Sequence, residues 1–221
     1  MNDRRLEHLT ACGLAPTQCR VLDVGAGLGD LAMYFHDREC QVSVTDGRAL
    51  NVEMIKAGQT AAPTRRAAVI DLDSPPGPPP VPYEVVVCYS VLNLLERPAQ
   101  AIGFLANCLS RRGGMLLLET PVLCAAGTHF HTKQAPDDRP TGSLHGVECH
   151  FTRHWVWEKL KACFSHTYIP ELQVCHDEFP LSWDECRADR AQTARAVFVA
   201  SHGSINNRLL STRLLNRHRP G

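Results

Sequence analysis

The fold of this chain is decided by the stretch Val21-Leu22-Asp23-Val24-Gly25-Ala26-Gly27-Leu28-Gly29-Asp30. Its first four residues are mostly apolar and indicate a short buried strand, after which three glycines stand at alternate positions. Apolar residues then recur at helical spacing, at Leu28, Leu31, Ala32 and Phe35. A strand, a glycine turn and a helix in this order form the first unit of a nucleotide-binding α/β sheet.

The glycines of this turn allow a ligand to approach the backbone closely, because a Cβ atom there would clash with the ligand. A dinucleotide-binding fingerprint would require a glycine at position 30, where this chain has Asp30. The pattern Asp-x-Gly-x-Gly-x-Gly instead resembles motif I of the class I S-adenosylmethionine (SAM) methyltransferases.

Strands alternate with helices along the rest of the chain. Helical spacing is found over residues 3–11, 28–37, 50–55, 98–109 and after the predicted capping residue Thr152. Strands are expected at 19–24, 41–45, 66–70, 85–88, 115–119, 167–169 and 196–200. We therefore predict an α/β, Rossmann-like methyltransferase sandwich with helices on both faces. Its seven-stranded sheet is mostly parallel and has an antiparallel last strand.

The composition is that of a globular protein with a sizeable core. Of the 221 residues, 44% are hydrophobic and 21% charged, and the formal net charge is zero. We expect no nucleic acid or membrane partner, because a balanced charge gives no overall attraction to phosphates. The first ten residues lack the apolar core of a signal peptide, and no apolar run is long enough to span a bilayer, so we expect a cytoplasmic protein.

We predict one SAM-binding domain over residues 1–201, in which two loops carry substrate contacts. Residues 121–150 show no periodicity, which is typical of a lid or a substrate loop, and residues 172–194 form the second loop. Residues 202–221 are a basic tail that contains four arginines and no acid. Such a tail is usually a terminal helix whose leucines pack on the body or on a second subunit, and we expect a monomer or a homodimer.

The ten cysteines include no Cys-x-x-Cys pair, so zinc-ribbon and thioredoxin-like sites find no support. Several fall inside predicted strands or helices, namely Cys40, Cys88, Cys108 and Cys163. We expect these to be small buried apolar residues in a reducing compartment.

The resemblance to class I methyltransferases extends over roughly residues 15–201 and implies SAM as the cofactor. Asp46 stands at the tip of the second strand, about 20 residues after the glycine turn, where the family places an acid that binds both ribose hydroxyls. Asp71-Leu72 ends the third strand, where the family contacts adenine, although Asp73 is also available as the acid. The predicted cofactor-binding residues are Asp23, Gly25, Ala26, Gly27, Gly29, Asp46, Gly47, Asp71, Leu72, Cys88 and Tyr89.

Three later segments are similar to a bacterial subgroup of generic methyltransferases: residues 116–120, 179–183 and 195–201. Asn93-Leu94 follows the fourth strand where the family usually carries Glu-His or Tyr-His. The candidate catalytic residues are Tyr89, Asn93, His129 and His176. Tyr89 is equally suited to packing on the cofactor and to touching the substrate.

Six histidines fall between residues 129 and 166, in and near the long loop. His129-x-His131 with His145, Cys149 or His150 would supply metal ligands or a base. The spacing matches no known metal motif, so we predict surface or lid histidines and no metal.

Three functions agree with these patterns. The first, which we favour, is a SAM-dependent methyltransferase that acts on a small molecule, in bacterial secondary metabolism. The second is a SAM lyase or cyclase of the same fold, which forms a cyclic amino acid and methylthioadenosine. The third is a non-catalytic sensor of SAM or of a metal.

Overall fold

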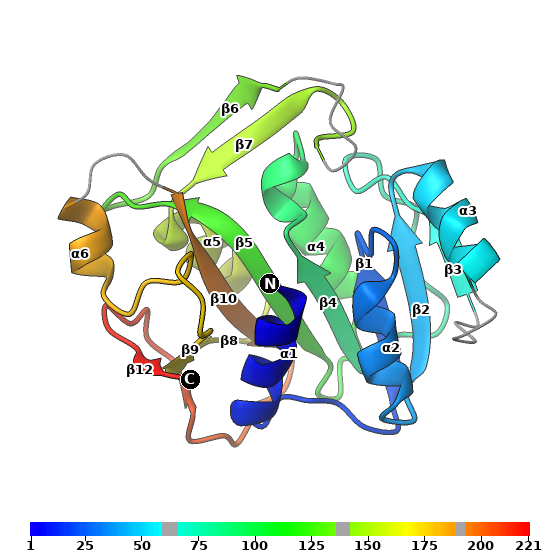
Figure 1. Ribbon diagram of the computed structural model, residues 1–221, viewed down its shortest axis with the longest axis horizontal. Coiled ribbons are helices and arrows are strands. Elements are labelled where there is room, and N and C mark those ends of the chain that lie inside the picture. Colours follow the sequence, from blue (N-terminus) through cyan, green and yellow to red (C-terminus); the bar gives the residue numbers. More distant parts are fainter. Residues whose placement is uncertain (59–65, 136–141, 189–192) are drawn as a thin grey trace.

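The computed structural model describes residues 1–58, 66–135, 142–188 and 193–221. Within them, the main sheet contains eight strands in the order β11-β8-β10-β5-β4-β1-β2-β3 (Figure 1). The strands are β1 (Arg20–Val24), β2 (Gln41–Asp46), β3 (Arg66–Val69), β4 (Val85–Tyr89), β5 (Met115–Leu123), β8 (His166–Pro170), β10 (Thr193–Ser201) and β11 (Leu210–Ser211). Strands β1 to β5 are parallel, and β10 is antiparallel to both β5 and β8.

This sheet confirms the predicted α/β sandwich, with one strand more than expected. The seven predicted strands are all present, and the last of them in sequence, β10, is antiparallel. The additional strand β11 forms because the buried Leu210 pairs with Pro170 at the free edge of β8.

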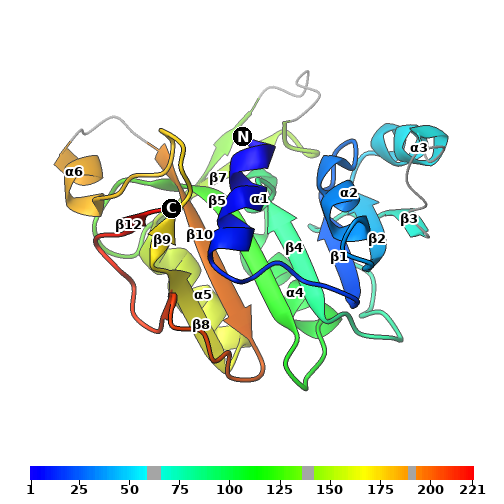
Figure 2. The same ribbon diagram turned by 60° about the horizontal axis from the view of Figure 1, so that its bottom comes forward.

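Helices cover both faces of the sheet. They are α1 (Asn2–Ala11), α2 (Asp30–His36), α3 (Ala49–Gly58), α4 (Pro98–Cys108), α5 (Arg153–Cys163), α6 (Trp183–Ala188) and the single 3-10 turn η1 (Leu92–Leu94). Figure 2 shows α1 and α2 on one face and α4 and α5 on the other. Pro98 starts α4, and the Thr152 hydroxyl caps α5 by accepting from the Trp155 amide at 3.4 Å, as predicted.

The alternation of side chains along the parallel strands creates two cores. Val21 on β1 belongs to the cluster that includes Phe35 of α2, whereas its neighbour Leu22 belongs to the opposite cluster, with Leu105 of α4 and Leu160 of α5. Because adjacent residues of a strand point to opposite faces, the central strands β1, β4 and β5 contribute to both cores, whereas the edge strand β3 is largely exposed.

The segment 121–150 contains more regular structure than its sequence predicted. Strand β5 continues to Leu123, and β6 (Phe130–Gln134) pairs with β7 (Val147–Phe151) in an antiparallel hairpin. In Figure 1 this hairpin lies above the carboxyl ends of the parallel strands. β6 is exposed throughout and polar after Phe130, so it carries no apolar alternation from which a strand could be recognised.

The basic tail, residues 202–221, forms no helix, which corrects that expectation. It folds back along the edge of the molecule, where β12 (Arg219–Pro220) pairs with β9 (Leu172–Gln173). Its leucines pack on the body: Leu210 is buried, and Leu214 and Leu215 contact the core of α4 and α5.

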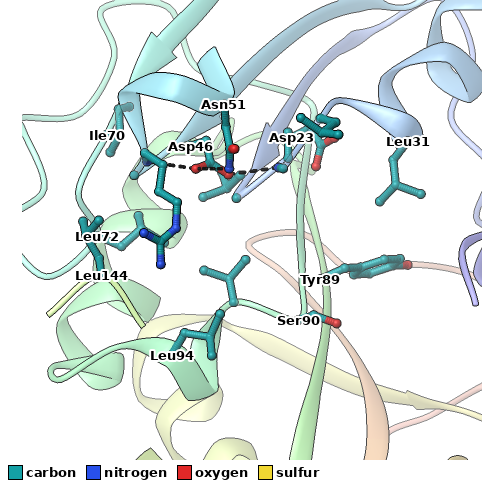
Figure 3. Close-up of a pocket in the computed structure, with 18 of the residues that line it drawn as sticks. Asp23, Leu31, Asp46, Asn51, Ile70, Leu72, Tyr89, Ser90, Leu94 and Leu144 are labelled. Atoms are coloured by element: carbon teal, nitrogen blue, oxygen red, sulfur yellow. Dashed lines mark hydrogen bonds between the residues drawn. The ribbon is translucent and has the colours of Figure 1, made fainter. Parts of the chain in front are cut away.

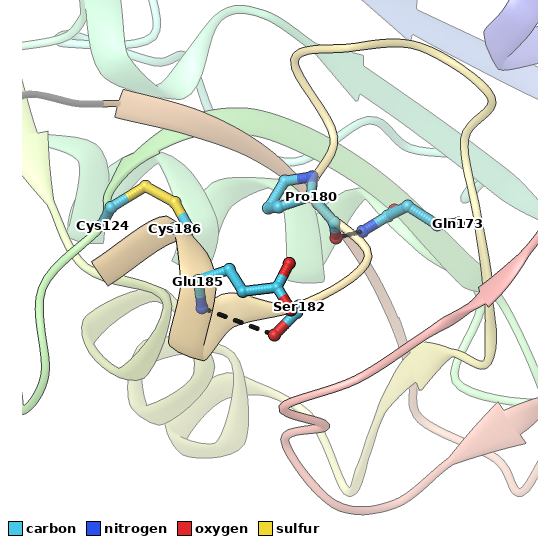
Figure 4. Close-up of a disulfide and its surroundings, with 6 residues drawn as sticks. All are labelled: Cys124, Gln173, Pro180, Ser182, Glu185 and Cys186. Carbon is cyan, nitrogen blue, oxygen red and sulfur yellow. Dashed lines mark hydrogen bonds between the residues drawn. A yellow bond between two sulfur atoms is a disulfide. The ribbon is translucent and has the colours of Figure 1, made fainter. Parts of the chain in front are cut away.

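Of the four cysteines predicted to be buried, Cys40, Cys88 and Cys108 are buried and Cys163 is half-buried. One pair that the sequence did not suggest is bridged: Cys124, at the end of β5, forms a disulfide with Cys186 of α6 (Figure 4). Among the described residues, no helix has the length and apolar character needed to span a bilayer.

Candidate cofactor and substrate site

A cavity of about 780 Å³ opens where β1, β2 and β4 end and the chain leaves the sheet (Figure 3). This is the edge at which open α/β sheets bind their ligands. Most of the predicted cofactor residues line it, namely Asp23, Gly25, Ala26, Gly27, Asp46, Gly47, Asp71, Leu72 and Tyr89. Gly29 and Cys88 are not among the lining residues. Gly29 is the N-cap of α2, with φ +85°, and Cys88 is fully buried in the core.

The glycine turn presents bare backbone to the cavity. Gly25 and Gly27 both adopt left-handed conformations, with φ +68° and +59°, which favour glycine over every other residue. The Ala26 amide donates to the Thr45 carbonyl at 3.0 Å, and the Gly27 amide donates to Asp46 Oδ2 at 2.9 Å. These two bonds tie the turn after β1 to the end of β2, so the two elements form one wall of the site.

Asp46 is buried at the tip of β2, beside the glycine turn (Figure 3). Besides Gly27, the Arg48 amide donates to its Oδ1 at 2.9 Å, and Asn51 Nδ2 donates to the same oxygen at 3.0 Å. A carboxylate offers about four acceptor sites. Three of them are therefore taken by the chain itself, and a ribose would use the remaining one or replace Asn51.

The segment after β3 and residues 142–145, before β7, close the same side of the cavity. Asp71 Oδ2 and His145 Nε2 lie 2.9 Å apart, while Asp71 Oδ1 accepts from the Asp73 amide at 2.9 Å. Leu144 lines the cavity and lies against Gly47, where an added Cβ would stand 3.1 Å from its Cδ2. Asp71 thus lines the cavity, and its alternative, Asp73, does not.

Asp73 instead stabilises the segment that precedes α4. Its two carboxylate oxygens accept from the backbone amides of Glu96 and Arg97, at 3.0 and 2.6 Å, just before α4 begins. Asp71, Asp73 and His145 place one ligand atom each within 4.8 Å of one another. Because the Asp73 carboxylate is already bonded to two amides, the group is better explained as loop and helix-capping contacts than as a metal centre.

Asp23 carries an unsatisfied carboxylate at the centre of the site. Its side chain is buried, and Oδ2 has no hydrogen-bond partner among the described residues. Burial, followed by repulsion from Asp46 and Asp30, raises the pKa of Asp23 from 3.8 to about 7. A buried carboxylate without a partner is costly, and a cation bound next to it would remove that cost.

The four predicted catalytic residues are not brought together. Tyr89 and Asn93 line the cavity, and Asn93 Oδ1 is buried without a hydrogen-bond partner in the described part of the chain. Burial raises the pKa of Tyr89 well above its usual range, which leaves its hydroxyl protonated at neutral pH. His129 and His176 are not lining residues. The His129 amide donates to the Thr152 hydroxyl, and His176 packs edge-on against Phe179.

Sequence reasoning missed a polar cluster at the other side of the cavity, which we call the Glu119 cluster: Arg5, Ser90, Glu119 and Arg195. Glu119 is fully buried at the level where β4 ends, and it forms ion pairs with Arg5 of α1 and with Arg195 of β10. Arg5, Ser90 and Arg195 also line the cavity. The sequence does contain one signal for this cluster. Glu119 directly follows the apolar residues of β5, and a charged residue in a buried strand needs a partner of opposite charge.

The strand order and the glycine turn define the class: this is the fold of the class I SAM-dependent methyltransferases, and the predicted resemblance is confirmed. Residues 22–116 match the family model described as a methyltransferase domain. A comparison with curated protein sequences finds no match.

Three solved structures illustrate the likeness. The N-terminal domain of EvdMO1, crystallised with S-adenosylhomocysteine (SAH) and D-fucose, has a TM-score of 0.67 at 15% identity, covering 90% of this chain and 81% of its own. The [4+2]-cyclase SpnF has a TM-score of 0.63 at 18% identity, covering 90% and 80%. A SAM-dependent methyltransferase from Mesorhizobium loti has a TM-score of 0.62 at 19% identity, covering 90% and 97%. At these identities the likeness establishes the fold.

Proposed function

We propose that this protein is a SAM-dependent methyltransferase that acts on a small molecule. The observation that carries the proposal is the buried, unpartnered carboxylate of Asp23 next to the glycine backbone of residues 25–27. SAM carries two positively charged groups, an ammonium and a sulfonium. A buried carboxylate attracts such charges, and bare glycine backbone leaves room for the ligand beside it. Two proteins that share the fold support this proposal: the N-terminal domain of EvdMO1 was crystallised in the presence of SAH, and the Mesorhizobium loti protein is described as a SAM-dependent methyltransferase.

Different residues of the cavity would bind different parts of the cofactor. Asp23 would hold the ammonium group, and the glycine turn would accommodate the methionine part against bare backbone. Asp46 would accept from the ribose, and Asp71 with Leu72 would contact the adenine. When bound, the sulfonium supplies a methyl group with a good leaving group, so the chain has to align the acceptor and exclude water.

A small acceptor agrees with the size of the site. The cavity volume of about 780 Å³ lies within the range of small-molecule sites, roughly 300–1,000 Å³. The charge balance of the whole chain gives no general attraction to a polyanion. We further propose biosynthesis in the cytoplasm as its setting and a monomer or homodimer as its form.

The test is incubation of the purified protein with SAM and pools of small metabolites, followed by mass spectrometry of the products. Formation of SAH together with an acceptor heavier by one methyl group would support the proposal. Methylthioadenosine without a methylated product would overturn it in favour of a SAM cyclase. SAM that is bound tightly and stays intact with every pool would point to a sensor instead.

The pKa of Asp23 predicts that SAM binding depends on pH. Because the carboxylate holds a cation only when ionised, and its pKa is raised to about 7, affinity should rise from pH 5.5 to pH 7.5. Below pH 7 we expect the dissociation constant to increase by up to about tenfold for each pH unit. Calorimetry of SAH binding measures this slope, and Asp23→Asn should remove it. An equal slope in this variant would contradict the assignment.

A further inference from the structure

The Glu119 cluster places two guanidinium groups on one buried carboxylate. Arg195 Nη1 donates to Glu119 Oε1 at 2.7 Å, and Arg5 Nη2 donates to Glu119 Oε2. The Glu119 side chain is 0% exposed, whereas the Arg5 and Arg195 side chains are 9% and 20% exposed. The second acid that pairs with Arg195 is Glu178, whose side chain is 52% exposed, so solvent screens its charge. The buried part of the cluster therefore carries an excess of one positive charge.

Ser90 holds the two guanidinium groups at the cavity wall. Its hydroxyl oxygen accepts from Arg195 Nη1 at 2.7 Å and also from Arg5 Nη2. Ser90 is one of three non-glycine residues with a positive φ in the described chain, at +60°. Such a conformation is unfavourable for serine, and strained backbone of this kind clusters at functional sites. Here it directs the hydroxyl towards the arginines at the end of β4.

Hydrogen-bond donors remain in the cluster after these contacts. Arg195 donates through Nε to Glu178 and through Nη1 to Ser90 and Glu119, while Nη2 donates to none of the described residues. Arg5 Nε is buried and likewise lacks a partner there. Because both side chains line the cavity, a bound anion would find donors and an uncompensated charge at this wall.

The cluster lies on the side of the cavity away from the ribose-binding acid. Asp46 ends β2, whereas Ser90 follows β4 and Glu119 and Arg195 belong to β5 and β10, and β1 separates the two groups in the sheet. If the cofactor lies over β1 and β2 as proposed above, the space beside Arg195 belongs to the second substrate. We infer that Arg195 binds a carboxylate of the methyl acceptor, so that the acceptor is an organic acid.

A carboxylate fits this wall better than a neutral polar group or a phosphate. A neutral acceptor would leave the excess positive charge of the buried cluster uncompensated. A phosphate brings up to two negative charges, and the cluster offers one. Nη2 of Arg195, which donates to none of the described residues, can donate a charge-assisted hydrogen bond to one oxygen of a carboxylate.

The experiment uses protein saturated with SAH and a panel of aromatic and aliphatic carboxylic acids, each paired with its own primary amide. Ligand-observed NMR measures the dissociation constant of every member. We expect at least one acid to bind at least about tenfold more tightly than its amide. In Arg195→Gln this preference should disappear, while the dissociation constant for SAH stays within about twofold.

Two further variants separate the effect of the positive charge of Arg195 from the structural role of its side chain. Arg195→Lys keeps a cation and should retain a preference for the acid. Glu178→Gln leaves the guanidinium in place without its exposed partner, so the preference should persist or grow. Circular dichroism and thermal unfolding without ligand report that each variant is folded, independently of SAH binding.

The outcomes distinguish this inference from the proposed function on which it rests. If the wild-type protein binds no SAH, both fail. If it binds SAH but no acid binds better than its amide, the inference alone is overturned. If Arg195→Gln weakens SAH binding by about tenfold or more, the guanidinium serves the carboxylate of the cofactor, and the assignment to the acceptor is wrong.

Discussion

Replacing Asp46 with alanine is expected to weaken SAM binding by at least tenfold. The carboxylate lies where a ribose would be bound, and a hydrogen bond to a charged group contributes about 1.5–3 kcal/mol, which corresponds to roughly 10- to 150-fold in affinity. The loss should lie near the upper end, because Asp46 also fixes the glycine turn through the amide of Gly27. Isothermal titration calorimetry with SAH measures the change.

The matched control for this change is Asp46→Asn. Asparagine has the same shape and keeps one acceptor oxygen for the amides of Gly27 or Arg48, but it has no charge. Its affinity should fall between those of the wild type and Asp46→Ala. Unchanged affinity in Asp46→Ala would remove Asp46 from the cofactor site.

Replacing Gly25 with alanine is expected to lower the free energy of unfolding by roughly 2–5 kcal/mol. The left-handed conformation at φ +68° costs about 1–2 kcal/mol for a residue with a Cβ. The new Cβ would also stand 2.2 Å from Val91 Cγ2, and forcing an extra methyl into a packed site costs about 1–3 kcal/mol. Urea denaturation of the ligand-free protein gives the difference.

Gly27→Ala is the control for the packing contribution. Gly27 has nearly the same conformation, at φ +59°, but its added Cβ would meet no atom within 4 Å. The free energy of unfolding of Gly27→Ala should therefore fall only by the conformational contribution, about 1–2 kcal/mol. Equal losses in the two variants would show that Val91 yields without cost, and would contradict the crowding that we describe.

The sheet and the cofactor side of the site could be predicted from sequence because their signals are local. The glycine turn, Asp46 and Asp71 each stand at the end of a strand that the sequence predicts, and parallel strands bring their carboxyl ends to one edge. Periodicity likewise identified the helix that follows Thr152 and the strand that became β10.

The acceptor side could not be predicted in this way, because it joins residues that lie far apart in the chain. Arg5 and Glu119 are separated by 114 positions, and Arg195 comes from a strand that turns back antiparallel to β5. Arg5 lies in α1, and no local sequence pattern distinguishes it from the other polar residues of that helix. The candidate histidines were chosen from their place in the sequence, His129 in the long loop and His176 beside a segment similar to the bacterial subgroup, and neither is among the residues that line the cavity.

The position of β10 between β5 and β8 has a consequence for the synthesis of the protein. Every parallel strand is synthesised before residue 193, so one long edge of β5 stays without its partner until β10 has been synthesised. An exposed strand edge with apolar side chains is a place where chains associate. The same strand carries Arg195, so the pairing that covers the edge of β5 also brings Arg195 to the wall of the cavity.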